Sequence, residues 1–236
     1  MIAILTSLLT FVLATLYFTH RSLRSTLHAH HECTLPPQIT TRITSLPADL
    51  TTHPEKYIIF YDQASRPVSR RLLPDLPLPE LLTALLRRNM AAFSHFPQAW
   101  LLRLNCPTER VSFCSSYIQK LEFGQGECVC GVYRVAARKE DSVELEMSRG
   151  DVVGRLVIGY VVDKEQDTVT FSNETVMWSR KDEDGGGGGK IPLENRVVRF
   201  FHEMTAWWLM DSGVCYLMDM DGSEVDERVA FEKDGE

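Results

Sequence analysis

Apolar and polar positions divide the chain into four regions: an apolar N-terminal run, a region with helical spacing, a region where every second residue is apolar, and a long apolar helix. The last of these, Leu193–Met218, contains no proline and has room for about seven helical turns. Residues three and four apart share one face of a helix, and here they form an apolar stripe. The stripe consists of Val197, Phe201, Met204, Trp208 and Cys215. We therefore expect this helix to lie against the rest of the domain, with Trp208 facing the sheet.

Two earlier segments also have helical spacing. Pro77–Phe96 carries apolar residues three and four apart, and Pro79 and Glu80 suit its first turn. Gln98–Leu104 predicts a short second helix, with Trp100 in the core. Together with the C-terminal helix, these segments are the predicted helices of the soluble part.

Between these helices the apolar spacing changes to two, which is typical of strands with one wet face. The predicted strands are Val111–Gln119, Glu127–Arg138, Ser142–Arg149, Val152–Val162 and Thr168–Ser179, with an earlier one at Lys56–Tyr61. Short polar connectors predict antiparallel hairpins, and Asp182–Lys190 predicts a flexible glycine-rich loop. The sequence thus predicts an α+β fold, an antiparallel sheet gripped by the C-terminal helix, with its core wholly after Leu78.

The N-terminal run, Ile2–Phe18, is seventeen residues without a charge. As a helix it reaches roughly 25 Å, close to the ~27 Å core of the endoplasmic reticulum membrane. No basic residue precedes it, and Arg21 and Arg24 follow it, so the positive-inside rule keeps that end cytosolic. We predict an uncleaved transmembrane helix and a cytosolic domain on the endoplasmic reticulum. A cleaved signal peptide is the alternative, although no small-residue cleavage site follows.

The chain then divides into four segments: a transmembrane anchor at 1–20, a juxtamembrane and proline-rich segment at 21–76, the folded domain at 77–218 and an acidic tail at 219–236. The tail holds −6 of the formal net charge of −7, so the charge predicts a solvated terminus. No basic stripe with interleaved aromatic residues occurs, and a nucleic-acid partner is not expected.

Candidate metal and phosphate motifs are incomplete. His28, His30, His31 and Cys33 are close in sequence, but zinc needs a second pair of ligands and none is evident. The glycine run has Ile191 where a phosphate-binding loop needs serine or threonine. We therefore predict neither a metal nor a cofactor.

Asn173 begins an Asn-Glu-Thr glycosylation sequon. Glycosylation requires a lumenal face, and the domain is expected in the cytosol, so the sequon is predicted to be unused. The same topology predicts that the six cysteines are reduced thiols.

The order of these elements resembles the helix-grip superfamily of START-like proteins and polyketide cyclases. The resemblance rests on Trp100, Phe123–Val135, Gly154–Leu156, Thr168–Trp178 and Asn195–Trp208. It implies a lipophilic small molecule held between the sheet and the long helix. The chain is also similar to membrane-anchored accessory proteins of fungal polyketide–peptide biosynthesis, which implies a membrane location and other membrane-bound biosynthetic enzymes as partners.

Residues that face this gap are the candidate site. For acid–base catalysis they are His202, Glu203 and Tyr160; for the ligand pocket they are Phe201, Met204, Trp208 and Tyr133. Arg199 can instead pair with Glu203 on the helix surface, which leaves catalysis open. Two functions remain: a cofactor-free cyclase or isomerase acting on a lipophilic intermediate, and a non-catalytic lipid-binding or scaffold protein for membrane enzymes.

Overall fold

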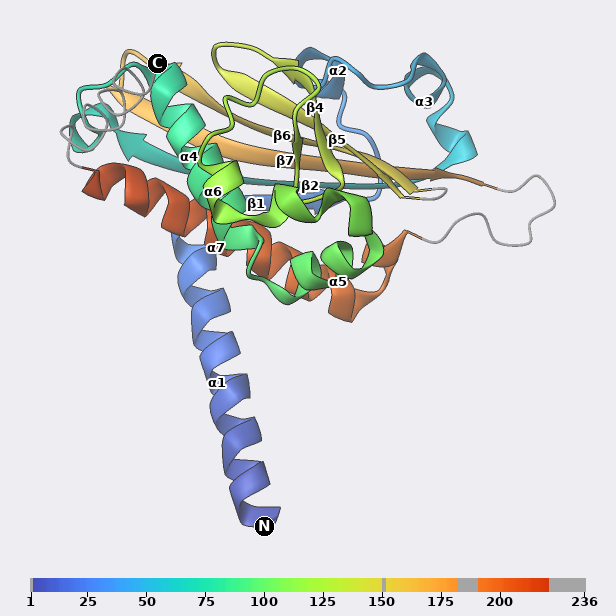
Figure 1. The fold of residues 1–236 in the computed structure, drawn as a ribbon, viewed down its shortest axis with the longest axis vertical. Coiled ribbons are helices and arrows are strands. Elements are labelled where there is room, and N and C mark those ends of the chain that lie inside the picture. Colours follow the sequence, from blue (N-terminus) through green and yellow to red (C-terminus); the bar gives the residue numbers. More distant parts are fainter. Residues whose placement is uncertain (1, 150–151, 182–190, 221–236) are drawn as a thin grey trace.

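The computed structural model describes residues 2–149, 152–181 and 191–220, without the side chains of residues 2–9, 12 and 13. The side chains of residues 149 and 152 are likewise not described. Within these ranges the fold is α+β, with a seven-stranded antiparallel sheet in the order β1-β2-β7-β6-β5-β4-β3 (Figure 1). The strands are β1 (His28–Glu32), β2 (Tyr57–Ser69), β3 (Cys128–Val129), β4 (Tyr133–Arg138), β5 (Ser142–Arg149), β6 (Val152–Asp163) and β7 (Thr168–Arg180). The long strands β2 and β7, distant in sequence, pair at full length.

Seven α-helices and four short 3₁₀ turns accompany the sheet in the described ranges. The helices are α1 (Ile2–Thr26), α2 (Ile39–Arg42), α3 (Ala48–Thr52), α4 (Leu78–Phe93), α5 (Pro97–Asn105), α6 (Ser115–Ile118) and α7 (Arg196–Asp219). The 3₁₀ turns are η1 (Pro54–Lys56), η2 (Arg70–Leu72), η3 (Pro107–Phe113) and η4 (Pro192–Glu194). The predicted antiparallel sheet and long C-terminal helix are confirmed. The predicted strand at Val111–Gln119 is wrong, because η3 and α6 occupy it.

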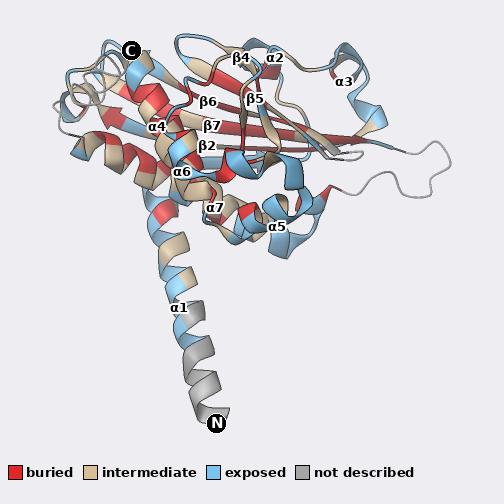
Figure 2. Cartoon of the chain, viewed as in Figure 1, coloured by how far each residue is buried: buried red, intermediate tan, exposed pale blue. Residues whose placement is uncertain are grey.

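Helix α7 lies along one face of the sheet and contacts β2 and β7, with α4 packed beside it (Figure 1). Asn195 starts the helix, since its side chain accepts hydrogen bonds from the amides of Val197 and Val198. The helices approach closely at Gly213, where a Cβ atom would lie 2.5 Å from Asn89 Oδ1. The main core lies between the sheet and these helices, and its residues are among the buried ones drawn in red in Figure 2.

The expected orientation of α7 is wrong. Trp207 is the buried tryptophan, 9% exposed, whereas Trp208 is 36% exposed. Val197 and Phe201, which were expected in the same stripe, are also exposed. The buried residues of α7 are Met204, Trp207, Met210, Gly213, Val214 and Leu217. Trp100 of α5 was expected in the core and is instead 57% exposed.

The opposite face of the sheet is covered by the segment that contains α2 and α3 (Figure 1). Ile39, Ile43 and Leu50 of this segment form a second core with Ile59 of β2 and Trp178 of β7. The expectation of a core wholly after Leu78 is therefore wrong, and the range 77–218 leaves out strand β2.

A buried carboxylate fixes this covering segment. Glu144 of β5 accepts hydrogen bonds from the backbone amides of Thr44 and Ser45 at 3.0 and 3.1 Å, and from both hydroxyls. Arg155 of β6 lies 3.7 Å from Glu144 and donates to the carbonyl of Ser45. Buried polar groups need such partners, so the network favours one placement of the segment on the sheet.

Helix α1 projects away from the domain, but its last turns belong to the core (Figure 1). Leu23 of the helix and Leu27 just after it are buried, and the centroid of the His20 ring lies 5.3 Å from that of Trp207. Across the described part of the chain, no helix combines the length and the apolar character needed to cross a bilayer. The predicted loop at 182–190 and all but the first two residues of the acidic tail lie outside the described residues.

Candidate functional site

A cavity of about 490 Å³ lies between the sheet and its helices. Its helical walls come from α4, α5 and α7, and its floor comes from β5, β6 and β7. On α7 the lining residues are His202, Thr205, Ala206, Leu209 and Met210. This spacing of three and four places them on one face of the helix. The volume falls within the roughly 300–1,000 Å³ typical of small-molecule sites.

Cross-strand register explains the floor. Thr175 of β7 pairs with Leu156 of β6, and Asn173 pairs with Ile158. Since side chains alternate across a strand, these four residues face the same side of the sheet. All four line the cavity. The described lining residues include no Asp, Glu, Lys or Arg, so the cavity suits an uncharged molecule.

One side of the cavity contains an ion pair. His202 lines the cavity, and its Nε2 lies 3.4 Å from Oδ1 of Asp62, a buried residue of β2. Asp62 pairs in register with Thr175, so the two side chains lie beside each other on the same face of the sheet. The His202 side chain is 31% exposed, whereas the Asp62 side chain is 5% exposed. The aspartate therefore sits behind the histidine and orients its ring.

The same contact governs the protonation of His202. Burial lowers the pKa of the imidazole, while the charge and hydrogen bond of Asp62, together with the charge of Glu203, raise it, and the net shift is upward. The charge of the buried carboxylate therefore stabilises the protonated imidazole relative to the neutral ring. His202 can exchange a proton at the cavity wall.

Further polar groups continue from His202 around the wall. Gln98 of α5 donates from Nε2 to Thr205 Oγ1 at 3.0 Å and to the carbonyl of Phe201 at 3.4 Å. Its Oε1 is buried and has no hydrogen-bond partner among the described residues. Asn173 is occupied, since it accepts from the amide of Ala64 and donates to the carbonyl of Ala206. The Thr175 hydroxyl makes no hydrogen bond to another described residue.

Of the seven predicted catalytic and pocket residues, two line the cavity: His202 and Tyr133. Tyr133 lies on the far wall with its ring 5.7 Å from that of Phe93, and burial raises its pKa, which keeps the phenol neutral. Glu203 points elsewhere, with Oε1 3.3 Å from Nδ1 of His31 on β1. Arg199 does not pair with Glu203, because its Nε donates to the carbonyl of Leu193.

The other four predicted residues lie outside the cavity lining. Tyr160 donates a hydrogen bond to the carbonyl of Glu140 in a connecting turn. Met204 is buried in the main core, whereas Phe201 is exposed. Trp208 packs at the surface, with its ring 5.4 Å from that of Phe96. The predicted stripe of α7 was therefore rotated away from the face that lines the cavity.

Two other candidates from the sequence also have a definite place. His31 faces α7, whereas His30 pairs with Glu32 on the edge strand β1. In the part of the chain that the structure describes, no three potential metal ligands lie together. Asn173 is buried against the backbone of β2 and α7, so the folded domain has no room for a glycan at this sequon.

The residues that sequence reasoning missed are Asp62, Gln98 and Thr175. Asp62 follows directly after the predicted strand Lys56–Tyr61, so continuing the alternation by one residue would have placed it on the face opposite Tyr61. No local signal connects it with His202, which is 140 positions away. Comparison of the chain with protein-family models, characterised proteins and solved structures gives no significant match.

Proposed function

We propose that this protein holds an uncharged lipophilic molecule in the cavity beneath α7, as a membrane-anchored accessory protein of secondary-metabolite biosynthesis. The observation that carries the proposal is the cavity itself, about 490 Å³ in volume and lined without a charged carboxylate, lysine or arginine among the described residues. Apolar walls with a few converging polar groups are typical of sites for small organic molecules.

The order of elements supports a helix-grip-like fold for this function. One long strand, β2, is followed by α4 and α5, then by the antiparallel run β3 to β7, and finally by α7. The resemblance to START-like proteins and polyketide cyclases rests on this order. In such a fold the ligand lies between the sheet and the last helix, where this chain has its cavity.

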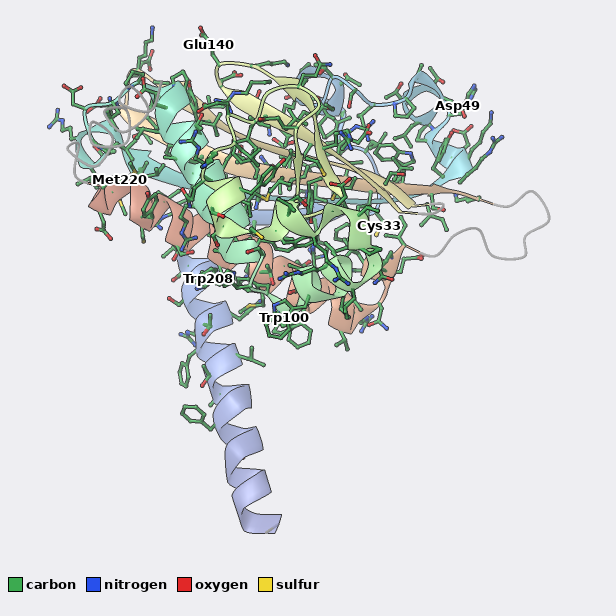
Figure 3. All side chains as sticks on the ribbon, in the orientation of Figure 1. Cys33, Asp49, Trp100, Glu140, Trp208 and Met220 are labelled. Atoms are coloured by element: carbon green, nitrogen blue, oxygen red, sulfur yellow. The ribbon has the colours of Figure 1, made fainter. Side chains whose placement is uncertain are left out.

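The surface supports placement at a membrane. Helix α1 exposes Phe11 and Phe18, and α5 exposes Trp100 and Leu104. Trp100 lies on the side of the domain from which α1 projects (Figure 3). Tryptophan favours the membrane–water interface. We propose that α1 anchors the protein in the endoplasmic reticulum membrane with the domain in the cytosol, beside other membrane-bound biosynthetic enzymes.

A binding experiment tests the proposal. The full-length protein in lipid nanodiscs is titrated with N-phenyl-1-naphthylamine, a neutral apolar probe, by calorimetry, with empty nanodiscs as the blank. We expect saturable binding that Leu156→Trp removes by filling the cavity. Val161→Trp, on the same strand but exposed, is the matched control and should bind like the wild type. Equal binding by the Leu156→Trp protein, or none by the wild type, would reject the proposal.

A cofactor-free isomerase or cyclase is the second candidate, and the Asp62–His202 pair favours it. In an isomerisation, neutral His202 would remove a proton from the carbon beside a carbonyl and return it at another carbon of the same molecule, so no co-reactant is needed. An apolar β,γ-unsaturated ketone tests this by the ultraviolet absorbance of its conjugated product. Turnover should rise with pH as His202 loses its proton, and His202→Gln should abolish it. Binding without turnover favours the non-catalytic lipid-binding or scaffold function.

A further inference from the structure

We infer that the ligand carries a hydroxyl or carbonyl oxygen, and that the polar arc formed by Gln98, Thr175 and His202 binds it. This inference rests on the proposed function, because it names the ligand class of the same cavity. All three residues line the cavity, and two side-chain contacts and one backbone pairing connect them. Gln98 contacts Thr205, which lies one helical turn from His202, and His202 contacts Asp62, the register partner of Thr175.

The strongest indication is the amide of Gln98. Its Nε2 contacts the carbonyl oxygen of Phe201, which can only accept, so the other end of the amide is fixed as the acceptor Oε1. This oxygen is buried and lacks a donor among the described residues, and Gln98 is one of the residues that line the cavity. Buried acceptors are seldom left without a partner. A ligand hydroxyl is the group that would complete it.

The other two residues of the arc add further hydrogen-bonding groups. Thr175 offers a hydroxyl that can both donate and accept, and no described residue engages it. Nε2 of His202 contacts Asp62, whereas Nδ1 makes no hydrogen bond to another described residue. When protonated, His202 also carries a donor at Nδ1 that a ligand oxygen can accept from. A pure hydrocarbon would leave all three groups unpaired, whereas an oxygenated ligand would satisfy them.

The rest of the lining restricts where the oxygen can lie. Most of the α4 wall and the β5–β6 floor is apolar, with Met90, Phe93, Met147, Leu156 and Ile158, whose side chains offer no hydrogen bond. The polar lining residues in this part of the cavity are Asn89, whose Oδ1 already accepts from Arg88, together with Tyr133 and Ser148. The unpartnered acceptor of Gln98 lies on α5, so the ligand class is an apolar body with an oxygen at that end, as in a phenol, a sterol-like alcohol or a cyclic ketone.

Two probes of the same shape test this class. The full-length protein in nanodiscs is titrated with 2-naphthol and with 2-methylnaphthalene, which differ by a hydroxyl in place of a methyl group, and empty nanodiscs give the blank. One satisfied hydrogen bond corresponds to about tenfold in affinity, so we expect 2-naphthol to bind about tenfold more tightly. Thr175→Val and Gln98→Met keep the approximate side-chain shape and should remove most of this preference without weakening 2-methylnaphthalene.

Thr170→Val is the matched control, because Thr170 lies on the same strand and does not line the cavity. Circular dichroism and the unchanged affinity for 2-methylnaphthalene establish that each variant is folded. Equal wild-type affinities for the two probes, or a preference that survives in both variants, would overturn the oxygen-binding inference while the lipophilic cavity stands. Failure of both probes to bind would reject the proposed function together with this inference.

Discussion

The two adjacent tryptophans of α7 give a direct test of how this helix faces the sheet. Trp207 is 9% exposed, belongs to the main core and lies 5.3 Å from the His20 ring of α1. Truncation of a buried tryptophan to alanine typically costs about 3–5 kcal/mol, since it removes apolar contacts and leaves a void. We therefore expect Trp207→Ala to lower the free energy of unfolding by about 3–5 kcal/mol.

Trp208 should be much less important for stability. It is 36% exposed, packs on Phe96, and has the Arg88 guanidinium carbon 5.1 Å from its ring centroid. An aromatic pair contributes about 0.5–1.5 kcal/mol, and an exposed cation–π contact about 0.5–1 kcal/mol. Trp208→Ala loses these contacts, about 1–2.5 kcal/mol together, in addition to the partial burial of the ring, and should cost less than Trp207→Ala.

Urea unfolding of the full-length protein, followed by circular dichroism, measures both free energies. Each variant should shift the transition midpoint and leave the slope with denaturant unchanged, because the surface exposed on unfolding stays nearly the same. A Trp208→Ala variant that loses as much stability as Trp207→Ala would refute the reasoning. It would place the buried stripe of α7 where the spacing of apolar residues alone had indicated.

Three further predictions concern stability. Gly213→Ala should destabilise the domain by about 1–3 kcal/mol, because the new Cβ would meet Asn89 at 2.5 Å; a lower thermal midpoint checks this. Glu144→Ala should cost about 1–3 kcal/mol and make residues 34–56 more sensitive to limited proteolysis, since the buried amides of Thr44 and Ser45 lose their acceptor while Arg155 keeps Glu146. Burial lowers the pKa of His202, Asp62 raises it, and the net shift is upward. The pair therefore stabilises the fold fully below the unfolded-state pKa of about 6.5. This contribution is lost as the pH rises through the folded-state pKa of His202. Urea midpoints at several pH values should show this loss in the wild type and little of it in Asp62→Asn.

Periodicity predicted most of the architecture because most elements bury one regular face. The strand at Ser142–Arg149 has the bounds expected from alternation, and α7 differs from Leu193–Met218 by a few residues at its start. The facing of α7 was not predictable in the same way. Its apolar residues surround the helix, so spacing alone does not distinguish Trp207 from Trp208, and contacts with α1 and α4 decide between them.

The missed elements depend on contacts between distant segments. Strand β1 is His28–Glu32, a polar stretch whose residues are nearly all exposed, and only pairing with β2 makes it a strand. The candidate site depends on the same kind of information. Asp62 reaches His202 because β2 pairs with β7 beneath α7. The unpaired acceptor of Gln98 can be recognised only from the structure, where its Nε2 donates to Thr205.

Helix α1 is joined rigidly to the domain, because it runs without a break from Ile2 to Thr26 and its last turn packs into the core. A polar contact adds to this joint, since Thr26 donates a hydrogen bond to Asp211 of α7. The orientation of the N-terminal end of α1 therefore determines the direction in which the cavity faces. Inserting one residue near Phe18 would turn the outer part of the helix by about 100° relative to the domain and lengthen it by about 1.5 Å. Inserting seven residues would lengthen the helix by about 10 Å and nearly restore the original rotation about its axis. The orientation of the domain relative to the N-terminal end of α1 and its distance from that end can thus be varied separately.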